Sequence, residues 1–543
     1  MYQNDASGPG RGSFIGASLL LVGVIAAVYA TRLDHQFLHW DDNVNVWNNA
    51  RLNPVTLRGV TEFWTDDYAR LYAPLTYTFF ALEALVSPRS GGLPNGALDP
   101  WVFHFGSLVL HSACALLVLA ILARLFGSMP AALAGALLFA VHPVQVESVA
   151  WISETRGLLA AFFSLAAVAL YVARWDAPAA RASYATVLYV LATLSFMLAL
   201  LSKPSAVVVP LIVLVLEIGL RRQKLGPAAA PLLLWFVLAA AFAGITMAVQ
   251  GSAADFVDNP ILARPFLALD AAVRHLFHIA LPARLGPDYG YSPSSVMDEQ
   301  LWFATGVLLI GLAYLLWTLP YKEVWLTALG VFFVALLPTL GLVTFDFQRV
   351  STVADRYAYL ALLGPAIALT WLLVRYGTPV RYGLVAVLLA LLAVASFDQS
   401  KHWSDDGTLA THALKLNLRS RTFQNQAGAA CFRNGEYDKA RVHFEEAVEL
   451  EPANMLSVYN LALTQLRLGE PEKAAANLRE VVRQQPNHAD AHAHLGEALT
   501  RLKDYAAARQ AYQDALAANS FCQLAIQGLA RLDTLELPEE DGG

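Results

Sequence analysis

Charged residues are scarce in this chain. Of its 543 residues only 15% are Asp, Glu, Lys or Arg, whereas 57% are hydrophobic, and the mean hydropathy is +0.47. Because soluble domains carry about 25% charged residues, the composition excludes a wholly soluble protein. The net charge of −6 and the lack of a basic stripe argue against a nucleic-acid partner.

Cysteine is scarce as well. Cys114, Cys431 and Cys522 lie far apart in the sequence and form no CxxC pair. This spacing argues against a disulfide framework and against a zinc knuckle.

Long apolar runs are plentiful up to about residue 397 and then cease. Runs of about 18 or more residues are long enough to cross a hydrocarbon core of about 30 Å. The sequence therefore predicts an all-α fold: a polytopic membrane helix bundle followed by a separate helical domain. We expect eleven spans, at 14–31, 101–123, 130–150, 157–173, 184–201, 205–220, 229–249, 301–319, 323–343, 356–374 and 380–397.

The first apolar segment has two interpretations. Val28-Tyr29-Ala30 resembles the cleavage site of a signal peptide. The apolar core of the segment is longer than the usual 7–15 residues, which favours an uncleaved anchor. Both interpretations place the residues that follow it outside the cytoplasm.

Basic residues in the short loops predict the orientation. Arg124, Arg221, Arg222, Lys322 and Arg375 all fall on the same side as the N-terminus, which the positive-inside rule places in the cytoplasm. The long segments 32–100 and 250–300 then lie outside, and so does the C-terminal region. A span count that differs by one would move the C-terminal region across the membrane.

Two amphipathic stretches, 72–86 and 261–281, are expected to lie along the membrane interface. The second contains His275 and His278, three residues apart. We assign no metal site there, because no carboxylate or third histidine completes a ligand set.

After residue 420 the sequence repeats with a period of 34. Small residues recur in two phases, large ones in a third, and proline ends the first two units: Gly428, Ala462 and Gly496; Ala440, Ala474 and Ala508; Phe444, Leu478 and Tyr512; Pro452 and Pro486. This pattern is typical of tetratricopeptide (TPR) repeats. We expect a membrane domain at 1–400, a linker at 401–420, three repeats at 421–520, and a capping helix and tail at 521–543. Such an array offers a surface for a partner protein; a spacer or a dimerisation arm is the alternative.

Ionisable residues gather at the outer ends of several predicted spans. The adjacent carboxylates Asp41 and Asp42 follow the first span directly, and further charged or polar candidates sit in three other connections: His142, Glu147 and Arg156; Lys203; Arg349, Asp355 and Arg356. Charged groups at membrane depth are costly and mark functional sites. Because these residues are all expected on the same side of the membrane, the sequence predicts a single site outside the cytoplasm.

Acidic and cationic groups together suit transfer of a sugar from a lipid phosphate. The departing phosphate needs cations, for which Lys203, Arg156 and Arg356 are suitable. One carboxylate must take the proton of the attacking hydroxyl, and either Asp41 or Asp42 fits that role. Glu147 is a second base or orients the first. No metal ligand is assigned; two aspartates could hold a divalent cation, but the cationic side chains can neutralise phosphate without one.

Seven pieces of the sequence carry a resemblance to a known family: WDDNVNVWNN after the first span, YAPLTYTFFALE, FHFGSLVLHSACALLV, LLFAVHPVQVESVAWISETRGLLAAFF, LLSKPSAVVVPL, ADRYAYLALLG and the tandem repeats. Together they resemble the transmembrane and TPR-containing (TMTC-like) O-mannosyltransferases of the GT-C class and their bacterial relatives. The likeness extends over nearly the whole chain, and HPVQVESVAWIS is its most specific part.

The resemblance implies a GT-C membrane fold, a polyprenyl-phosphate-linked sugar donor such as a mannosyl lipid, and inversion at the anomeric carbon. It also implies an acidic base in the first external loop, which by motif match is Asp41 or Asp42, with Glu147 in the second. Tyr72 lies in the YAPL motif and joins the site candidates. A bacterial relative implies a cytoplasmic membrane with the site and the repeats on its outer face. The acceptor would be a protein Ser or Thr, or a glycan.

Two other functions remain open. An O-antigen-type glycan ligase or polymerase places its key Arg and His in a late external loop, so Arg274, His275 and His278 would then carry the chemistry. A non-catalytic anchor presenting a TPR scaffold for envelope assembly is the second alternative, and it predicts that the ionisable cluster can be replaced without loss.

Overall fold

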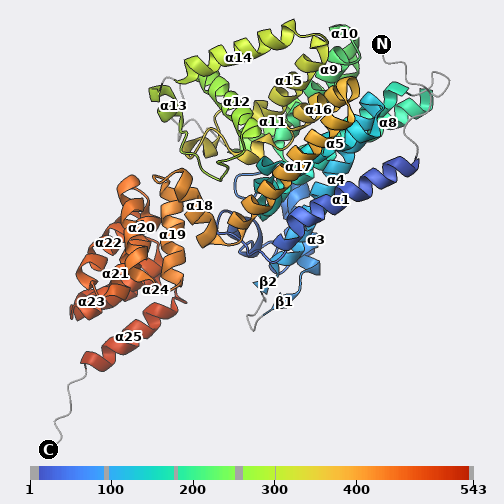
Figure 1. Ribbon diagram of the computed structural model, residues 1–543. Helices are drawn as coiled ribbons and strands as arrows, with labels where there is room; N and C mark the ends of the chain where they lie inside the picture. Colours follow the sequence, from blue (N-terminus) through green and yellow to red (C-terminus); the bar gives the residue numbers. More distant parts are fainter. Residues whose placement is uncertain (1–10, 91–96, 177–181, 251–260, 300, 537–543) are drawn as a thin grey trace, which may run out of the picture. The chain divides into compact units, whose positions relative to one another are not determined.

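The computed structural model describes residues 11–90, 97–176, 182–250, 261–299 and 301–536. The chain divides into two compact units, Met1–Asp405 and Asp406–Gly543. Figure 1 shows that the described residues are helical almost throughout. A single antiparallel pair of two-residue strands, β1 (Arg89–Ser90) and β2 (Ala97–Leu98), is the exception within the described ranges.

Seven helical segments of the first unit are long and apolar enough to cross a membrane: Arg11–Arg32, Pro100–Phe126, Ile152–Asp176, Ser183–Ser202, Leu225–Val249, Lys322–Thr339 and Pro379–Trp403. They contain helices α1 (Arg11–Tyr29), α4 (Pro100–Phe126), α7 (Thr155–Ala173), α8 (Ala182–Ser202), α11 (Leu233–Gln250), α15 (Lys322–Leu336) and α17 (Pro379–Ser400). The pair α5 (Met129–Val141) and α6 (Val146–Ala150) counts as an eighth span if it is taken as one bent segment. The protein is therefore an integral membrane protein.

The eleven spans expected from the sequence exceed this number. Three of the expected ranges contain apolar helical segments that are shorter, at Pro204–Gly219, Trp302–Thr318 and Leu363–Tyr376. Within the first of these, α9 (Val209–Gly219) has 11 residues and rises about 16 Å, about half of a hydrocarbon core. Apolar composition in these ranges thus predicts a helix but does not give it the length of a span.

The remaining helices of the first unit connect or flank the spans. They are α2 (Leu57–Thr65), α3 (Pro74–Val86), α12 (Arg264–Ala280), α13 (Pro293–Glu299), α14 (Leu301–Thr318) and α16 (Leu363–Tyr376). Helix α10 (Leu225–Ala229) instead forms the start of the span Leu225–Val249. Helices α3 and α12 occupy most of the two stretches expected at the membrane interface. Residues 91–96 and 251–260 of the two expected external loops, and 537–543 of the expected tail, lie outside the described residues.

The ends of the spans follow local sequence signals. The carboxylate of Asp99 accepts a hydrogen bond from the amide of Trp101 (3.0 Å), and Pro100 occupies the first turn of α4. Both features favour a helix start. Gly127 ends α4 in the left-handed conformation (φ 70°), which glycine adopts at little cost.

The span formed by α5 and α6 is bent by 50°. Pro143 follows α5, and proline supplies no amide hydrogen to continue the helical ladder. The ring nitrogen Nδ1 of His142 instead accepts a hydrogen bond from the amide of Val144 (3.2 Å). The bend therefore turns α6, with Glu147, away from the axis of α5.

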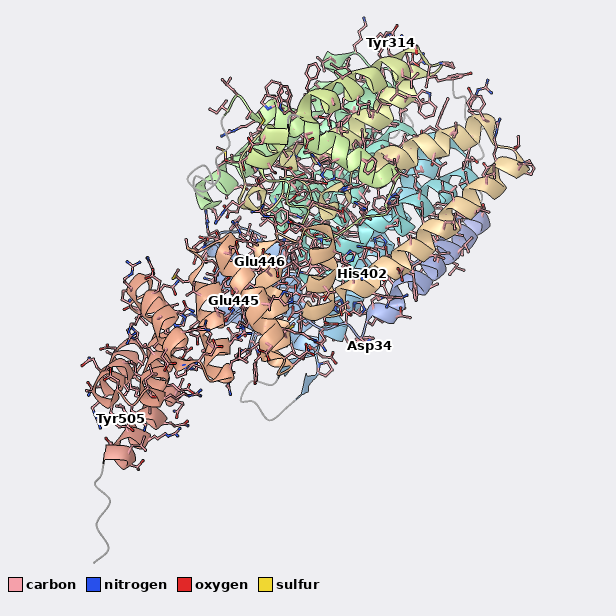
Figure 2. All side chains as sticks on the ribbon, turned by 60° about the vertical axis from the view of Figure 1, so that its left-hand side comes forward. Asp34, Tyr314, His402, Glu445, Glu446 and Tyr505 are labelled. Atoms are coloured by element: carbon pink, nitrogen blue, oxygen red, sulfur yellow. The ribbon has the colours of Figure 1, made fainter. Side chains whose placement is uncertain are left out.

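Spans of the first unit pack in neighbouring pairs. Helices α1, α4, α5 and α17 lie side by side, and α7 packs along α4 and α8 (Figure 1). Gly135 of α5 lets α16 approach closely, because a Cβ there would lie 2.2 Å from Oγ1 of Thr370. Apolar side chains also cover the outer faces; Tyr314 of α14, labelled in Figure 2, is 70% exposed, as expected for a face that contacts lipid.

The second unit is an array of helix pairs. Helix α18 (Asp406–Leu416) occupies much of the stretch expected as a linker. The pairs are α19 (Arg421–Arg433) with α20 (Tyr437–Leu450), α21 (Met455–Leu468) with α22 (Pro471–Gln484), and α23 (Ala489–Arg501) with α24 (Tyr505–Ala518), followed by α25 (Gln523–Glu536). The 34-residue pattern has a direct packing role: a Cβ on Gly496 would lie 2.7 Å from the ring of Tyr512.

Candidate functional site

The acidic pair after the first span does not present two equivalent carboxylates. Asp41 adopts the left-handed conformation (φ 71°), which is uncommon for a residue other than glycine. Asp42, the next residue, is completely buried. The turn of the backbone between them sends one carboxylate to the surface and the other into the protein.

The carboxylate of Asp42 is saturated with hydrogen bonds. Its Oδ1 accepts from the amide (2.8 Å) and the hydroxyl (2.5 Å) of Ser153, and its Oδ2 accepts from the amide of Leu38 (3.0 Å). Burial raises the pKa of Asp42 to about 7, although these three donors favour the charged form. Asp42 therefore acts as an anchor that fastens the loop after α1 to the segment around Ser153.

The carboxylate of Asp41 is exposed, and within the described part of the chain it makes no hydrogen bond or ion pair. Its surroundings are polar and aromatic. The hydroxyl of Tyr77 donates to Asn45 (2.9 Å). Burial raises the pKa of Tyr77, and the charges of Asp41 and Arg156 also affect it, the first raising it and the second lowering it. Asp41 is thus accessible to a substrate hydroxyl, whereas Asp42 is not.

A buried ion pair joins the second and the last of the predicted connections. The guanidinium of Arg356 binds the carboxylate of Glu147, which also accepts the backbone amide of Arg356 (2.9 Å). Three aromatic rings surround the guanidinium, those of Phe347 at 4.1 Å, Tyr357 at 4.9 Å and Trp151 at 5.3 Å. Such contacts stabilise a cation away from water, so Arg356 is held in one place.

A second carboxylate, Glu154, organises the other two cations. It is 1% exposed, binds the ammonium group of Lys203, and its Oε2 lies 3.8 Å from Nε of Arg156. We did not assign Glu154 a role from the sequence. The available signal was a second carboxylate in the HPVQVESVAWISETR stretch, two residues before Arg156.

Lys203 and Arg356 line one cavity, although they are 153 positions apart in the sequence. The cavity holds about 60 Å³, and its remaining lining is Ser148, Gly157, Ala160, Ala161, Ser164, Ser205, Ala206, Val208, Ala335, Thr339, Tyr357, Tyr359 and Leu360. Its polar groups are donors, and much of the rest is aliphatic. Such a lining suits an anion that carries an apolar chain.

The acidic loop and the cationic cavity meet at two adjacent residues. Ser153 donates both of its hydrogen bonds to Asp42, and Glu154 binds Lys203. The dipeptide therefore connects the loop that carries Asp41 with the cations that line the cavity. Four of the groups expected from separate parts of the sequence, Glu147, Arg156, Lys203 and Arg356, converge on this region.

The other sequence candidates have different partners. Nε2 of His142 contacts the carbonyl of Ile279 (3.0 Å) while its Nδ1 caps the bend, so this side chain is structural. The hydroxyl of Tyr72 donates to the carbonyl of Trp64 (3.1 Å). Asp355 accepts from the hydroxyl of Tyr289 (2.7 Å) and lies 3.4 Å from Nδ1 of His278. Arg349 is exposed. None of these four side chains lines the cavity.

Helix α12 carries the residues of the ligase alternative. Arg274 binds Asp270 (2.5 Å) and lies 3.7 Å from the ring centre of Tyr291. His275 is completely buried, and neither ring nitrogen has a hydrogen-bond partner among the residues that the structure describes. In the described part of the chain, no three His, Cys, Asp or Glu side chains come together in a group that could hold a metal ion.

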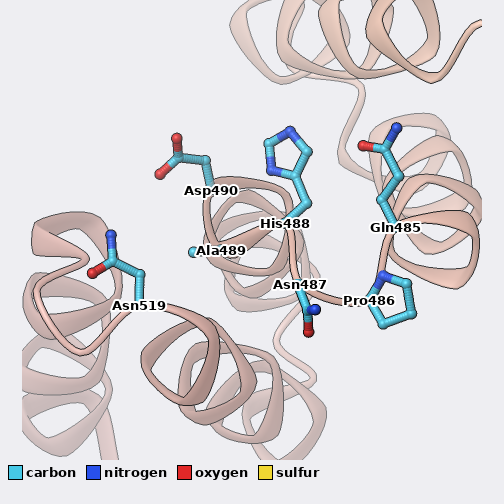
Figure 3. A pocket seen from close by; sticks show the side chains of 7 residues that line it. All are labelled: Gln485, Pro486, Asn487, His488, Ala489, Asp490 and Asn519. Atoms are coloured by element: carbon cyan, nitrogen blue, oxygen red, sulfur yellow. The ribbon is translucent and has the colours of Figure 1, made fainter. Parts of the chain in front are cut away.

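An open depression in the second unit lies at the turn between α22 and α23 (Figure 3). It is lined by Gln485, Pro486, Asn487, His488, Ala489, Asp490 and Asn519. The ring of His488 accepts a hydrogen bond from the amide of Ala491 (3.2 Å), and this side chain therefore caps α23. Its lining contains the carboxylate of Asp490 but no Lys or Arg that could stabilise a departing phosphate.

Comparisons with known proteins concern mainly the second unit. Tetratricopeptide repeat models match residues 422–454 and 459–521. Human "Protein O-mannosyl-transferase TMTC4" is 31% identical over 162 residues, 27% of this chain and 22% of that relative. Mouse "Protein O-mannosyl-transferase TMTC3" is 32% identical over 160 residues, 28% of this chain and 16% of that relative. The similarity lies over the repeats, and the chain spans about a fifth of the length of these curated relatives.

Two solved structures are also similar. The Sgt2 TPR domain from Aspergillus fumigatus is 26% identical and covers 21% of this chain and 78% of its own, with a TM-score of 0.21. The Archaeoglobus fulgidus oligosaccharyltransferase in the apo form is 12% identical and covers 72% of this chain and 56% of its own, with a TM-score of 0.41. This chain is thus an integral membrane protein whose C-terminal unit consists of tetratricopeptide repeats, with distant homologues among the TMTC O-mannosyl-transferases.

Proposed function

We propose that this protein is a GT-C-type membrane glycosyltransferase. It transfers one sugar, mannose or a similar hexose, from a polyprenyl-phosphate donor to a hydroxyl acceptor, with inversion at the anomeric carbon. The observation that carries the proposal is the cavity shared by Lys203 and Arg356, joined through Ser153 and Glu154 to the loop that bears an exposed carboxylate.

Asp41 is the base in this mechanism. It takes the proton of the acceptor hydroxyl as the oxygen attacks the anomeric carbon, a role that requires an accessible carboxylate. Asp42 is buried behind Ser153 and Leu38, so its part is to hold the loop that presents Asp41. Glu147 holds Arg356 and is too enclosed to meet an acceptor.

The cations serve the leaving group. As the glycosidic bond breaks, the electron pair goes to the phosphate oxygen, and the lipid phosphate departs as an anion. Lys203 and Arg356 in the cavity stabilise that charge, with Arg156 next to Glu154 completing the positive field. Aliphatic residues of the lining, among them Ala160, Val208 and Leu360, contact the carbon next to the phosphate, whereas the rest of the polyprenyl chain lies outside this cavity of about 60 Å³.

The repeats present the acceptor. TPR arrays bind partner proteins on their surfaces, and a protein Ser or Thr close to such an array would be held near the membrane. On the orientation predicted by the loop charges, site and repeats face the outside of the cytoplasmic membrane. The repeats bind the acceptor protein, whereas the sugar transfer itself depends on the membrane unit.

Transfer from radiolabelled polyprenyl-phosphate sugars to a hydroxyl acceptor tests the proposal. The full chain in nanodiscs should transfer label, and Asp41→Asn should slow transfer by roughly 100- to 10,000-fold. If Asp41→Asn keeps full activity, the assignment of the base fails. Activity that depends on His275 and Arg274 but not on Asp41 would favour a glycan ligase.

A further inference from the structure

The cavity that Lys203 and Arg356 share is lined by a buried hydroxyl, that of Ser148. Ser148 lies on α6 and is 1% exposed, and its Oγ makes no hydrogen bond within the described protein. The residue lines the cavity together with Lys203 and Arg356. A buried hydroxyl without a partner is disfavoured, because it has lost its bonds to water.

Ser18 of α1 also has a buried hydroxyl without a partner among the described residues, but it does not line the cavity. Two other serines of the membrane unit do have partners. The hydroxyl of Ser202 donates to the carbonyl of Leu198 (2.8 Å), one helical turn away, which is the usual local bond of a serine in a helix. The hydroxyl of Ser107 pairs with that of Thr155 (2.8 Å). Ser148 forms no such bond, so its proton remains available to a ligand in the cavity.

Neighbouring residues fix the position of this hydroxyl. Ser148 follows Glu147, whose carboxylate binds both the side chain and the backbone amide of Arg356. The amide of Trp151 donates to the carbonyl of Glu147 (3.2 Å) and closes the short helix on the other side. A donor held in this way loses little freedom when it binds an anion.

We infer that the Ser148 hydroxyl is a phosphate contact of the lipid donor. This inference rests on the proposed function. Lys203 has three N–H donors, of which Glu154 engages one, and Arg356 brings a fixed cation from the facing loop. Ser148 adds a neutral O–H donor in a fixed position. It keeps its proton throughout the reaction and favours a bound oxyanion in the cavity.

Binding of polyprenyl phosphate without a sugar tests the inference separately from transfer. The full chain in nanodiscs is titrated with polyprenyl phosphate, and the rise in melting temperature gives the apparent Kd. Ser148→Ala should raise that Kd about tenfold, as expected for a lost hydrogen bond to a charged group. Without ligand this variant should melt no lower than the natural protein, because the removed hydroxyl had no partner.

Ser107→Ala is the matched control. It removes a hydroxyl that is paired and lies outside the cavity lining, so it should lower the melting temperature without ligand and leave the Kd unchanged. If Ser148→Ala binds as the natural protein does while Lys203→Gln does not, Ser148 has no phosphate role and the proposed function stands. If the natural protein shows no response to polyprenyl phosphate, the inference and the donor assignment both fail.

Discussion

Asp42 accepts two hydrogen bonds from Ser153, a residue 111 positions further along the chain. The pair fastens the loop after the first span to the segment that carries Glu154. Because Asp41 is the next residue to Asp42, the same contact sets where the exposed carboxylate stands relative to the cations. In the proposed mechanism Asp41 is the base and Asp42 fixes its position.

Replacing Asp41 tests this division. We expect Asp41→Asn to lower kcat by roughly 100- to 10,000-fold, the range of a lost general base. The donor Kd and the melting temperature should stay unchanged, because the side chain is exposed and has no bonding partner among the described residues. Transfer kinetics with labelled donor and thermal unfolding in nanodiscs give the three values. A fall in melting temperature that matches that of Asp42→Asn would show that Asp41 is structural.

The burial of Asp42 should appear in the pH dependence of stability. Its carboxyl has a pKa of about 7 in the folded protein and about 3.9 in an unfolded chain. The folded state thus holds the Asp42 proton more tightly than the unfolded chain does. Protonation of Asp42 therefore stabilises the fold, an effect that is complete below pH 4 and is lost as the pH rises to 7. The melting temperature should therefore fall over this interval by more in the natural protein than in Asp42→Asn. Parallel curves for the two proteins would contradict the assigned pKa.

Glu154 is expected to act through Lys203. Either Glu154→Gln or Lys203→Gln should raise the KM for the lipid donor, and the double variant should be little worse than Lys203→Gln alone. Coupling between contacting charges is commonly about 0.5–3 kcal/mol, and the double-mutant cycle on kcat/KM measures it. As a control, Glu62→Gln removes a carboxylate that binds Arg51 and Arg58, and its effect should add to that of Lys203→Gln. Additive effects of Glu154 and Lys203 would exclude the positioning role.

Arg356 and Arg349 offer a matched pair of substitutions seven positions apart. Arg356→Met removes the partner of the buried Glu147 and should destabilise the membrane unit by about 3–5 kcal/mol, with loss of transfer. Arg349→Met affects an exposed side chain outside the cavity lining and should change neither property appreciably. Unfolding followed by tryptophan fluorescence, with transfer measured on the same samples, distinguishes the two variants. Equal effects would mean that the cavity does not define the site.

The repeats should respond to substitution independently of the membrane unit. Gly496→Val places a side chain against the ring of Tyr512 and should destabilise the repeat unit by about 1–3 kcal/mol, the usual cost of overpacking. Proteolysis after Arg or Lys in 406–536 should then become faster. The control Gly469→Asn replaces a left-handed glycine (φ 78°) with open space around it by a residue that tolerates this conformation. Equal digestion rates for the glycine variants would contradict the packing role.

The sequence predicts some features of this protein well because they depend on local patterns. Apolar run length predicts helices in each of the expected ranges, and the 34-residue period predicts the three helix pairs. The close approach of Gly496 to Tyr512 is seen only in the structure. The number of spans is less predictable: α9 is apolar, yet Pro204 and Gly219 bound a segment too short to cross alone. Composition shows whether a segment is apolar, but whether the segment crosses the membrane also depends on where the backbone turns.

The candidate site is predictable only in part. Loop charges predict that Lys203, Arg356 and Glu147 share one side of the membrane, and in the structure Glu147 binds Arg356, which lines one cavity with Lys203. The distinct environments of Asp41 and Asp42 depend on the positive φ of Asp41 and on a partner 111 residues away, which no local pattern encodes. Ser148 and Glu154 were missed for a related reason: a serine or a carboxylate becomes notable only when its neighbours in space are known.

The bend between α5 and α6 has a consequence for how this chain tolerates insertions. Glu147 and Ser148 reach their partners because a fixed number of residues separates them from Pro143. Since each residue in a helix turns the chain by about 100°, one added residue between His142 and Glu147 would rotate the ion pair and the free hydroxyl out of the cavity. Added residues at the turn between α22 and α23 would only lengthen a surface loop, so variation in length among natural relatives should accumulate there and avoid the bend.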